Sequence, residues 1–270
     1  MAKAASAEIG QRRYYHHIPA GAASCECNGS INPKCKYALL SVTTILKALP
    51  TPWLGAWAAK MVAQTALDEI DRLREMEARE GTEATLRYLK AAPWRTRDAA
   101  AERGTAVHAA AELGTTGEDV PENARKRVLA WHRWLDDYKP DIEYQEGTVY
   151  YPFYGYAGTF DLLARIGGVC KCHAEGLWLI DIKTGFLSWE HRLQQAAYKN
   201  ASFIGDEYGN PVADVPVIDH VGILGLHDDG YEFIEIKVGD DEWDAFQAVA
   251  NVGRYIDRLS VEKPRLVGKS

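Results

Sequence analysis

Residues 158–198 limit what this chain can fold into more than any other stretch. Two apolar runs lie at residues 162–166 and 177–180; the first ends at Gly167-Gly168, and Thr184-Gly185 follows the second after Asp181-Ile-Lys183. Short apolar runs between turn residues are typical of β-strands. Residues 189–204 then follow with the spacing of an amphipathic helix. We therefore predict a β-hairpin followed by a helix.

The acidic residues of the two predicted strands would meet at one edge of the hairpin. In an antiparallel pair the start of one strand lies beside the end of the other, so Asp161 and Asp181 would be neighbours. Because side chains alternate along a strand, Asp181 and Lys183 would project from the same face. Two carboxylates suit Mg²⁺ or Mn²⁺, and a lysine beside such a metal can orient or deprotonate a water for attack on phosphorus. A surface salt bridge at a charged strand edge is the simpler explanation, and a lone Asp-x-Lys would favour it.

Four motifs in chain order resemble those of the PD-(D/E)xK nuclease superfamily, and within it the RecB-like exonuclease branch. They are Gly104-Thr-Ala-Val-His108 with Glu112, Gly158-Thr-Phe-Asp161, Asp181-Ile-Lys183 and Gln194-Gln-Ala-Ala-Tyr198. Each motif is weak alone, but all four in this order form a specific signal. The resemblance implies an α/β fold with a restriction-endonuclease-like core, a mixed β-sheet flanked by helices, and a helical N-terminal region. We expect an N-terminal arm with accessory helices over residues 1–95 and the nuclease core over residues 96–270.

The resemblance also implies roles for single residues. The catalytic residues would be Lys183, Asp181 and Asp161. The ligands of Mg²⁺ or Mn²⁺ would be His108, Asp161, Asp181 and the backbone carbonyl of Ile182. The supporting residues would be Glu112, Gln194, Tyr198 and Glu146, with Gln195 as the alternative to Gln194 if the register is shifted. The simpler explanations are an ordinary core or surface histidine, a solvent-exposed strand glutamate, and an amphipathic helix that packs through Ala196 and Ala197.

Five cysteines form two groups in predicted loops. Cys25, Cys27 and Cys35 lie near the N-terminus, and Cys170 and Cys172 lie at the tip of the predicted hairpin. These groups resemble two halves of a structural Zn²⁺ site, and reduced thiols in two loops are the alternative. Related nucleases with an iron–sulfur cluster have three cysteines near the C-terminus. This sequence has none after Cys172, so we expect no iron–sulfur cluster.

Composition and charge limit the function further. The chain has 270 residues and a formal net charge of -7, which argues against a protein that coats nucleic acid non-specifically. A nuclease remains compatible, because bound cations neutralise acidic ligands. The sequence has no apolar run of membrane-spanning length, and its start lacks the apolar segment of a signal peptide. We expect a cytoplasmic protein without membrane association.

Together these features predict a metal-dependent DNA exonuclease that acts in DNA recombination, repair or processing. We expect it to be encoded by a phage, to work in the host cytoplasm, and to have DNA and a recombinase or single-strand-annealing protein as partners. The alternatives are a structure-specific or restriction-type endonuclease on the same fold and a DNA-binding module that does not cut. Lys183-Thr184-Gly185 matches one β-lactamase motif, but the SxxK motif at Ser260–Lys263 lies after it and no Ser-Asp-Asn motif is present in the sequence.

The remaining elements are predicted from periodicity and from turn residues. We expect an irregular segment over residues 1–40, a short helix capped by Ser41, and a break at Pro93-Trp94. The longer predicted helices cover residues 54–80, 82–90, 96–113, 121–138 and 241–259. A strand is predicted over residues 143–154, and a second hairpin over residues 217–226 and 231–238.

Overall fold

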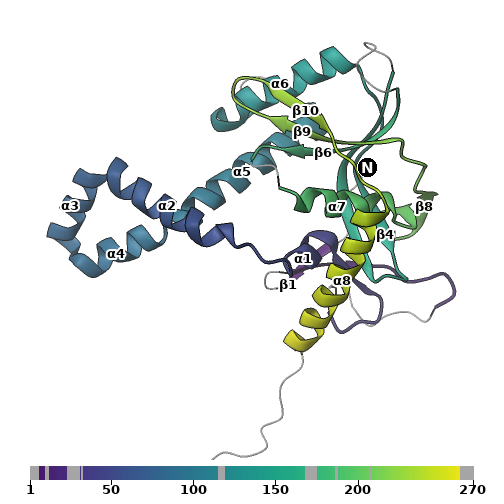
Figure 1. Ribbon diagram of the computed structural model, residues 1–270, viewed down its shortest axis with the longest axis horizontal. Coiled ribbons are helices and arrows are strands. Elements are labelled where there is room, and N and C mark those ends of the chain that lie inside the picture. The colour runs from purple at the N-terminus through teal and green to yellow at the C-terminus, as the bar shows by residue number, and fades with distance from the viewer. Residues whose placement is uncertain are drawn as a thin grey trace, which may run out of the picture. The chain divides into compact units, whose positions relative to one another are not determined.

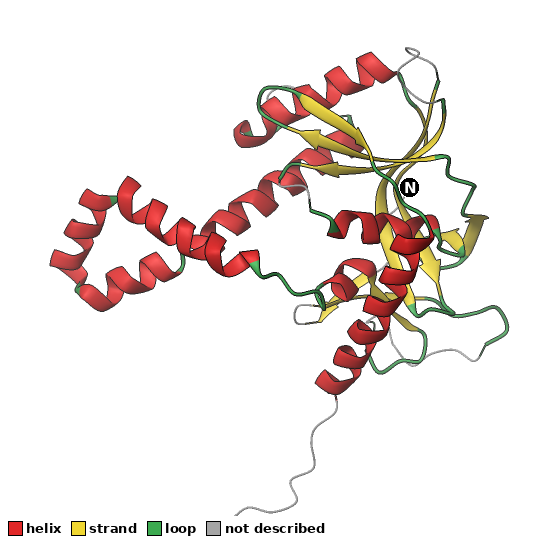
Figure 2. Cartoon of the chain, viewed as in Figure 1, coloured by secondary structure: helices red, strands yellow, loops and turns green. Residues whose placement is uncertain are grey.

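The computed structural model describes residues 6–9, 12–22, 31, 33–114, 119–167, 175–185, 188–206 and 208–261. In this part of the chain the fold is mixed α/β, with a mixed ten-stranded sheet flanked by helices (Figures 1 and 2). The predicted α/β class is thus confirmed. The chain divides into two compact units: a main unit of residues 1–49 and 126–270, and a second unit of residues 50–125. This division differs from the boundary expected at residue 95. The N-terminal strands pair into the main sheet, and residues 96–125 belong to the second unit, where helix α5 (Ala92–Leu113) packs with the preceding helices.

Strand β5 (Tyr156–Ile166) lies at the centre of the sheet. One of its edges pairs antiparallel with β4 (Asp141–Tyr151) along most of its length. The other edge is shared, because β3 (Ala38–Ser41) pairs parallel with residues 156–157 and β6 (Gly176–Lys183) pairs antiparallel with residues 162–166. Residues 158–161 therefore lie at a fork where β3 and β6 separate. This four-residue segment is Gly-Thr-Phe-Asp.

The other strands extend the sheet in three directions. Beyond β6 the order is β9 (His220–Leu226), paired parallel, and β10 (Tyr231–Glu235), paired antiparallel. Beyond β4 follow β7 (Phe203–Gly205) and β8 (Pro211–Asp214), and beyond β3 follow β2 (Arg12–His16) and β1 (Ser6–Ile9). The second predicted hairpin is confirmed as β9–β10.

One face of β6 packs against two helices of the main unit. Leu179 belongs to the same buried cluster as Leu193 of α7 (Glu190–Lys199) and Phe246 of α8 (Asp240–Val261). Because side chains alternate along a strand, Asp181 and Lys183 share this face with Leu179. The hydrophobic contact between the sheet and α7 therefore sets the distance between the helix and the two charged residues.

The opposite face of β6 is covered by aromatic rings. Trp178 packs against Phe233 of β10, and the Phe233 ring meets Trp134 of α6 (Glu122–Tyr138) edge to face. Aromatic pairs of this kind add about 0.5–1.5 kcal/mol to the stabilisation from burial alone. Both faces of β6 are thus buried, which explains its nearly continuous apolar sequence.

Helix α1 (Val42–Leu46) follows β3 directly. The Ser41 hydroxyl accepts a hydrogen bond from the Thr44 backbone N–H at 3.0 Å, which confirms the predicted cap. Val42 and Ile45 are fully buried. The cap fixes the direction in which the chain leaves β3, next to the fork in the sheet.

The second unit consists of α2 (Trp53–Asp68), α3 (Ile70–Glu80), α4 (Thr82–Lys90) and α5 (Ala92–Leu113). The prediction of one helix over residues 54–80 was wrong, because Glu69 leaves the helical conformation with φ −116° and ψ 28°. Its carboxylate accepts a hydrogen bond from the Tyr88 hydroxyl at 2.8 Å. The predicted break at Pro93 was also wrong. Pro93 lies in the first turn of α5, where a missing backbone N–H costs nothing.

Two predictions were wrong in the main unit. Residues 1–40 are not irregular throughout, because β1, β2 and the start of β3 lie there. The helix predicted over residues 189–204 ends at Lys199, and β7 begins at Phe203. The final helix is confirmed as α8, which starts with three acidic residues that suit the positive end of its dipole. None of the helices in the described ranges combines the length and the apolar composition that crossing a membrane requires.

Candidate functional site

Asp161 lies at the fork in the sheet and is bonded to the neighbouring strand. Its Oδ2 atom accepts a hydrogen bond from the backbone N–H of Ile182 at 2.6 Å. Leu162 pairs with Ile180, so Asp161 lies opposite Asp181 by register. The predicted antiparallel pairing of these two strands is confirmed. Its physical basis is the sequence rule that the start of one strand meets the end of the other.

Asp181 and Lys183 form an ion pair on the α7 face of β6. The Lys183 Nζ atom lies 2.8 Å from Asp181 Oδ2. Burial lowers the pKa of Lys183, but the negative charges of Asp181 and Asp161 raise it by more, so this pKa lies above its ordinary value. Lys183 is therefore a cation at neutral pH. In this state it can attract an anion or orient a water, but it cannot accept a proton.

The buried carboxylate of Asp181 fits a bound cation. Asp181 is 1% exposed, and apart from the Lys183 ammonium at 2.8 Å its Oδ2 atom has no hydrogen-bond partner among the described residues. A buried carboxylate oxygen is stabilised by further positive or donor groups. Together with Asp161 it forms a set of hard oxygen donors, which Mg²⁺ and Mn²⁺ prefer. The residues present therefore fit the predicted metal.

Glu146 brings a third carboxylate to the fork. Gln145 pairs with Leu162 and Gly147 with Phe160, so Glu146 lies opposite Asp161, and carboxylate oxygens of these two residues lie within 4.8 Å of one another. Glu146 has φ +53°. A non-glycine residue in this region is strained by about 1–3 kcal/mol, and such strain clusters at functional sites. The position and the backbone strain of Glu146 therefore favour a functional role for this residue more than the sequence alone does.

Helix α7 places Gln194 and Tyr198 over the fork. The Gln194 amide donates a hydrogen bond to the Tyr198 hydroxyl oxygen at 3.0 Å. Burial raises the pKa of Tyr198 well above its ordinary value, and the nearby charges of Asp181 and Asp161 act in the same direction. The phenol therefore stays protonated and can donate its hydrogen to a ligand. These two residues are brought together as their spacing predicts.

Gly158 explains how Tyr198 approaches the sheet. A Cβ atom at this position would lie 2.6 Å from Cε1 of the Tyr198 ring and 3.1 Å from a methyl group of Val42. Any larger residue would push the ring or α1 away from β5. Gly158 of the Gly158–Asp161 motif therefore makes room for the ring of Tyr198 of the α7 motif, and the two motifs contact each other at this point.

His108 and Glu112 lie on α5, in the second unit. They are four residues apart, so they share one helical face one turn apart, and both are half-buried. The main unit alone supplies Asp161, Asp181 and Glu146. The predicted roles of His108 as a metal ligand and of Glu112 as a supporting residue stay predictions.

His191 is a residue that the sequence interpretation did not single out. It lies in the first turn of α7, one turn before Gln194, and its Nδ1 atom accepts a hydrogen bond from the Ser188 N–H at 3.2 Å. Burial and the positive charge of Lys183 lower the pKa of His191, although Asp181 opposes this. The helical spacing 191, 194, 198 was the available signal, since these positions share one face.

Of the predicted zinc ligands, only Cys35 lies among the described residues. Cys25, Cys27, Cys170 and Cys172 lie outside them. The Cys35 Sγ atom lies 3.5 Å from His16 Nε2. Two ligands of a tetrahedral zinc, at about 2.3 Å for sulfur and about 2.0 Å for nitrogen, are separated by roughly this distance. His16 is therefore an additional candidate ligand, and the zinc site stays a prediction.

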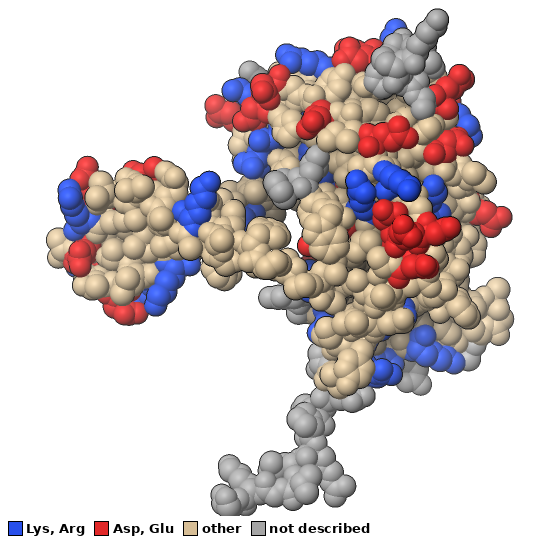
Figure 3. Space-filling view, viewed as in Figure 1, with Lys and Arg blue, Asp and Glu red and all other residues tan. Residues whose placement is uncertain are grey.

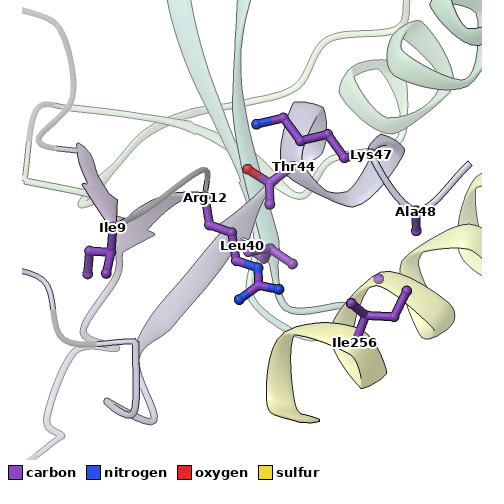
Figure 4. Close-up of a pocket in the computed structure, with 8 residues that line it drawn as sticks. Ile9, Arg12, Leu40, Thr44, Lys47, Ala48 and Ile256 are labelled. Carbon is purple, nitrogen blue, oxygen red and sulfur yellow. The ribbon is translucent and has the colours of Figure 1, made fainter. Parts of the chain in front are cut away.

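A separate pocket of about 370 Å³ lies between β1, β2, α1 and α8 (Figure 4). Arg12, Thr44 and Lys47 give it polar groups, and its apolar wall includes Leu40 and Ile256. None of the predicted catalytic residues lines it. Figure 3 shows acidic and basic side chains beside one another on the visible face of the main unit. The distribution of charge on that face therefore does not indicate where DNA would bind.

No protein-family model matches this chain, and no curated protein matches it. Fold and site together define a mixed α/β protein with three carboxylates at a fork in its sheet, where Lys183 pairs with the buried Asp181. A more particular assignment depends on the chemistry of these residues.

Proposed function

We propose that the protein is a metal-dependent DNA exonuclease with a restriction-endonuclease-like core of the RecB-like type. The observation that carries this proposal is the convergence of Asp161, Asp181 and Lys183 on neighbouring strands of the sheet. Glu146, opposite Asp161, and the Gln194–Tyr198 pair over the same strands support it. Binding of Mg²⁺ or Mn²⁺ by carboxylates is a common basis of phosphodiester hydrolysis.

Asp161, Asp181 and the Ile182 carbonyl would hold the metal, joined by His108 of the second unit. When bound, Mg²⁺ or Mn²⁺ would polarise the scissile phosphate and lower the pKa of a bound water. Lys183, held as a cation by Asp181, would orient the attacking water and stabilise the negative charge that develops on the phosphate oxygens. The Tyr198 hydroxyl and the Gln194 amide would donate hydrogen bonds to the phosphate or position Lys183.

We infer that the enzyme acts in recombination, repair or processing of DNA, in the cytoplasm of a phage-infected host, together with a recombinase or single-strand-annealing protein. A structural Zn²⁺ held by Cys35 and the other cysteines would serve stability and not catalysis. Elemental analysis of the purified protein tests this, because one zinc per chain supports it and no zinc contradicts it.

The activity is tested with end-labelled linear DNA and circular DNA, each incubated with Mg²⁺, Mn²⁺ or EDTA. An exonuclease removes the label from linear DNA in the presence of metal and leaves covalently closed circles intact. Cutting of circles would instead support the endonuclease alternative. Binding of DNA without any cutting would support the non-cutting module. Cleavage that Lys183→Ala leaves unchanged would remove the site assignment.

A further inference from the structure

Helix α7 carries a second polar row beside the Gln194–Tyr198 pair. His191 and Gln195 are four residues apart, so they lie one turn from each other on the same side of the helix. Positions 191, 194, 195 and 198 together form the continuous face of the helix that includes Tyr198. Two of these four residues have no role in the proposed function so far.

The tautomer of His191 is set by its surroundings. The Ser188 N–H can only donate, so the Nδ1 atom of His191 accepts and the ring proton of the neutral imidazole lies on Nε2. Burial and the positive charge of nearby Lys183 lower the pKa of His191, although Asp181 opposes this. His191 therefore offers one neutral N–H donor at Nε2, beside a cation that attracts anions.

Gln195 provides an independent observation on the same row. Its side chain is 1% exposed, and its Oε1 atom has no hydrogen-bond donor among the described residues. Buried polar atoms nearly always have a partner, which is protein or bound water. An acceptor left open one turn from His191 indicates that this row is completed by a group that the described residues do not supply.

We propose that His191 binds the substrate: its Nε2–H donates a hydrogen bond to a non-bridging oxygen of a DNA phosphate next to the one that is cut, and Gln195 accepts from a water that bridges to the same backbone. This inference rests on the proposed nuclease function. Tyr198 lies seven positions after His191, or about 10 Å along the helix. The two side chains would therefore contact different phosphates of one strand, with Lys183 drawing the anion between them.

Two substitutions at His191 separate substrate binding from a structural role. The amide nitrogen of His191→Gln can reach the place of Nε2, whereas the shorter His191→Asn places its amide near Nδ1, where its oxygen can still accept the Ser188 N–H. If His191 binds phosphate, the Asn variant raises KM for linear DNA about tenfold or more and the Gln variant stays within about threefold of wild type. Neither changes kcat more than about threefold. If His191 only supports the start of α7, KM is raised in the Gln variant and stays near the wild-type value in the Asn variant. That result overturns the inference.

The matched control is His220→Gln, because His220 pairs with Glu235 and lies beside Trp178, three residues before Asp181 on β6. This control is expected to leave KM unchanged. Circular dichroism checks folding of every variant. If His191→Asn does not fold, Gln195→Met is measured instead. This change removes the buried Oε1 acceptor, which has no partner among the described residues, without loss of volume. It is expected to fold with unchanged or higher Tm and to raise KM, and an unchanged KM overturns the inference.

Failure of the proposed function gives a different result. DNA affinity measured with Ca²⁺, in place of Mg²⁺ to prevent cutting, accompanies the kinetics. A wild-type protein that neither binds nor cuts DNA overturns the nuclease function and this inference with it. A wild-type protein that cuts, with equal KM for the Asn and Gln variants, overturns this inference alone.

Discussion

At the scale of single residues, Asp181 and Lys183 have opposite charges, and their predicted roles can be tested separately. Asp181 is predicted to bind metal, whereas Lys183 is predicted to act on the water and the phosphate. Asp181→Asn and Lys183→Met are both expected to lower cleavage at least a hundredfold. Only Asp181→Asn should also abolish the rise in Tm that Mn²⁺ produces, because only this change removes a ligand. Differential scanning fluorimetry with and without Mn²⁺ checks this. Equal metal responses of the two variants would contradict the division of roles.

Gly158 is expected to be intolerant of even one methyl group. A Cβ atom 2.6 Å from the Tyr198 ring forces that ring to move, so Gly158→Ala should lower the free energy of unfolding by about 1–3 kcal/mol and reduce cleavage. In a Tyr198→Leu background the same change should cost much less, because the ring atom is gone. A double-mutant cycle of urea unfolding measures this coupling. A coupling energy near zero would show that Gly158 matters for another reason.

The sequence suffices to predict some of these residues and not others. Asp161 and Asp181 follow from antiparallel pairing alone, and the Gln194–Tyr198 contact follows from helical spacing. The strained φ of Glu146 has no local sequence signal, since a glutamate is not favoured there. The role of His191 depends on how α7 is rotated about its axis against the sheet. That rotation is a result of tertiary packing and is not encoded in the helix itself.

At the scale of elements, Glu146 of β4, which has a positive φ, is expected to affect both the stability and the activity of the protein. Glu146→Gly and Glu146→Gln both remove the carboxylate, so both should lower cleavage. Only the glycine relieves the strain at φ +53°, so the Gly variant should be about 1 kcal/mol more stable than the Gln variant. Thermal unfolding of the two variants checks this difference. A Gln variant at least as stable as the Gly variant would mean that the backbone is not strained at this position.

Elements with strong local signals were predicted well, and those that depend on distant partners were not. The β5–β6 hairpin, the β9–β10 hairpin and α8 follow from apolar periodicity and turn residues. Strands β1, β2 and β3 are four or five residues long, which is too short for a clear alternation. They become strands because they pair with one another and because β3 pairs with β5. The change from α7 to β7 within a few residues is likewise set by pairing with β4.

At the scale of the whole molecule, the two compact units raise the question of whether His108 acts in the metal site. If His108 is a ligand, His108→Ala should reduce the Mn²⁺-dependent rise in Tm and weaken Mn²⁺ binding by about tenfold or more. The matched control is Glu83→Ala, an exposed residue of α4 in the same unit, which should leave metal binding unchanged. Isothermal titration with Mn²⁺ measures both. A wild-type affinity in His108→Ala would confine the metal site to the main unit.

The fork in the sheet also has a consequence for the order in which the chain folds. Leu40 of β3 pairs with Tyr156 of β5, so more than a hundred intervening residues, including the whole second unit, precede the partner strand. Closing a loop of this length costs conformational entropy before any pairing compensates for it. On a ribosome that adds about 5–20 residues per second, the first strands must wait several seconds for β5 to emerge. The predicted catalytic groups of the main unit therefore come together only late in synthesis, after the whole second unit has been made.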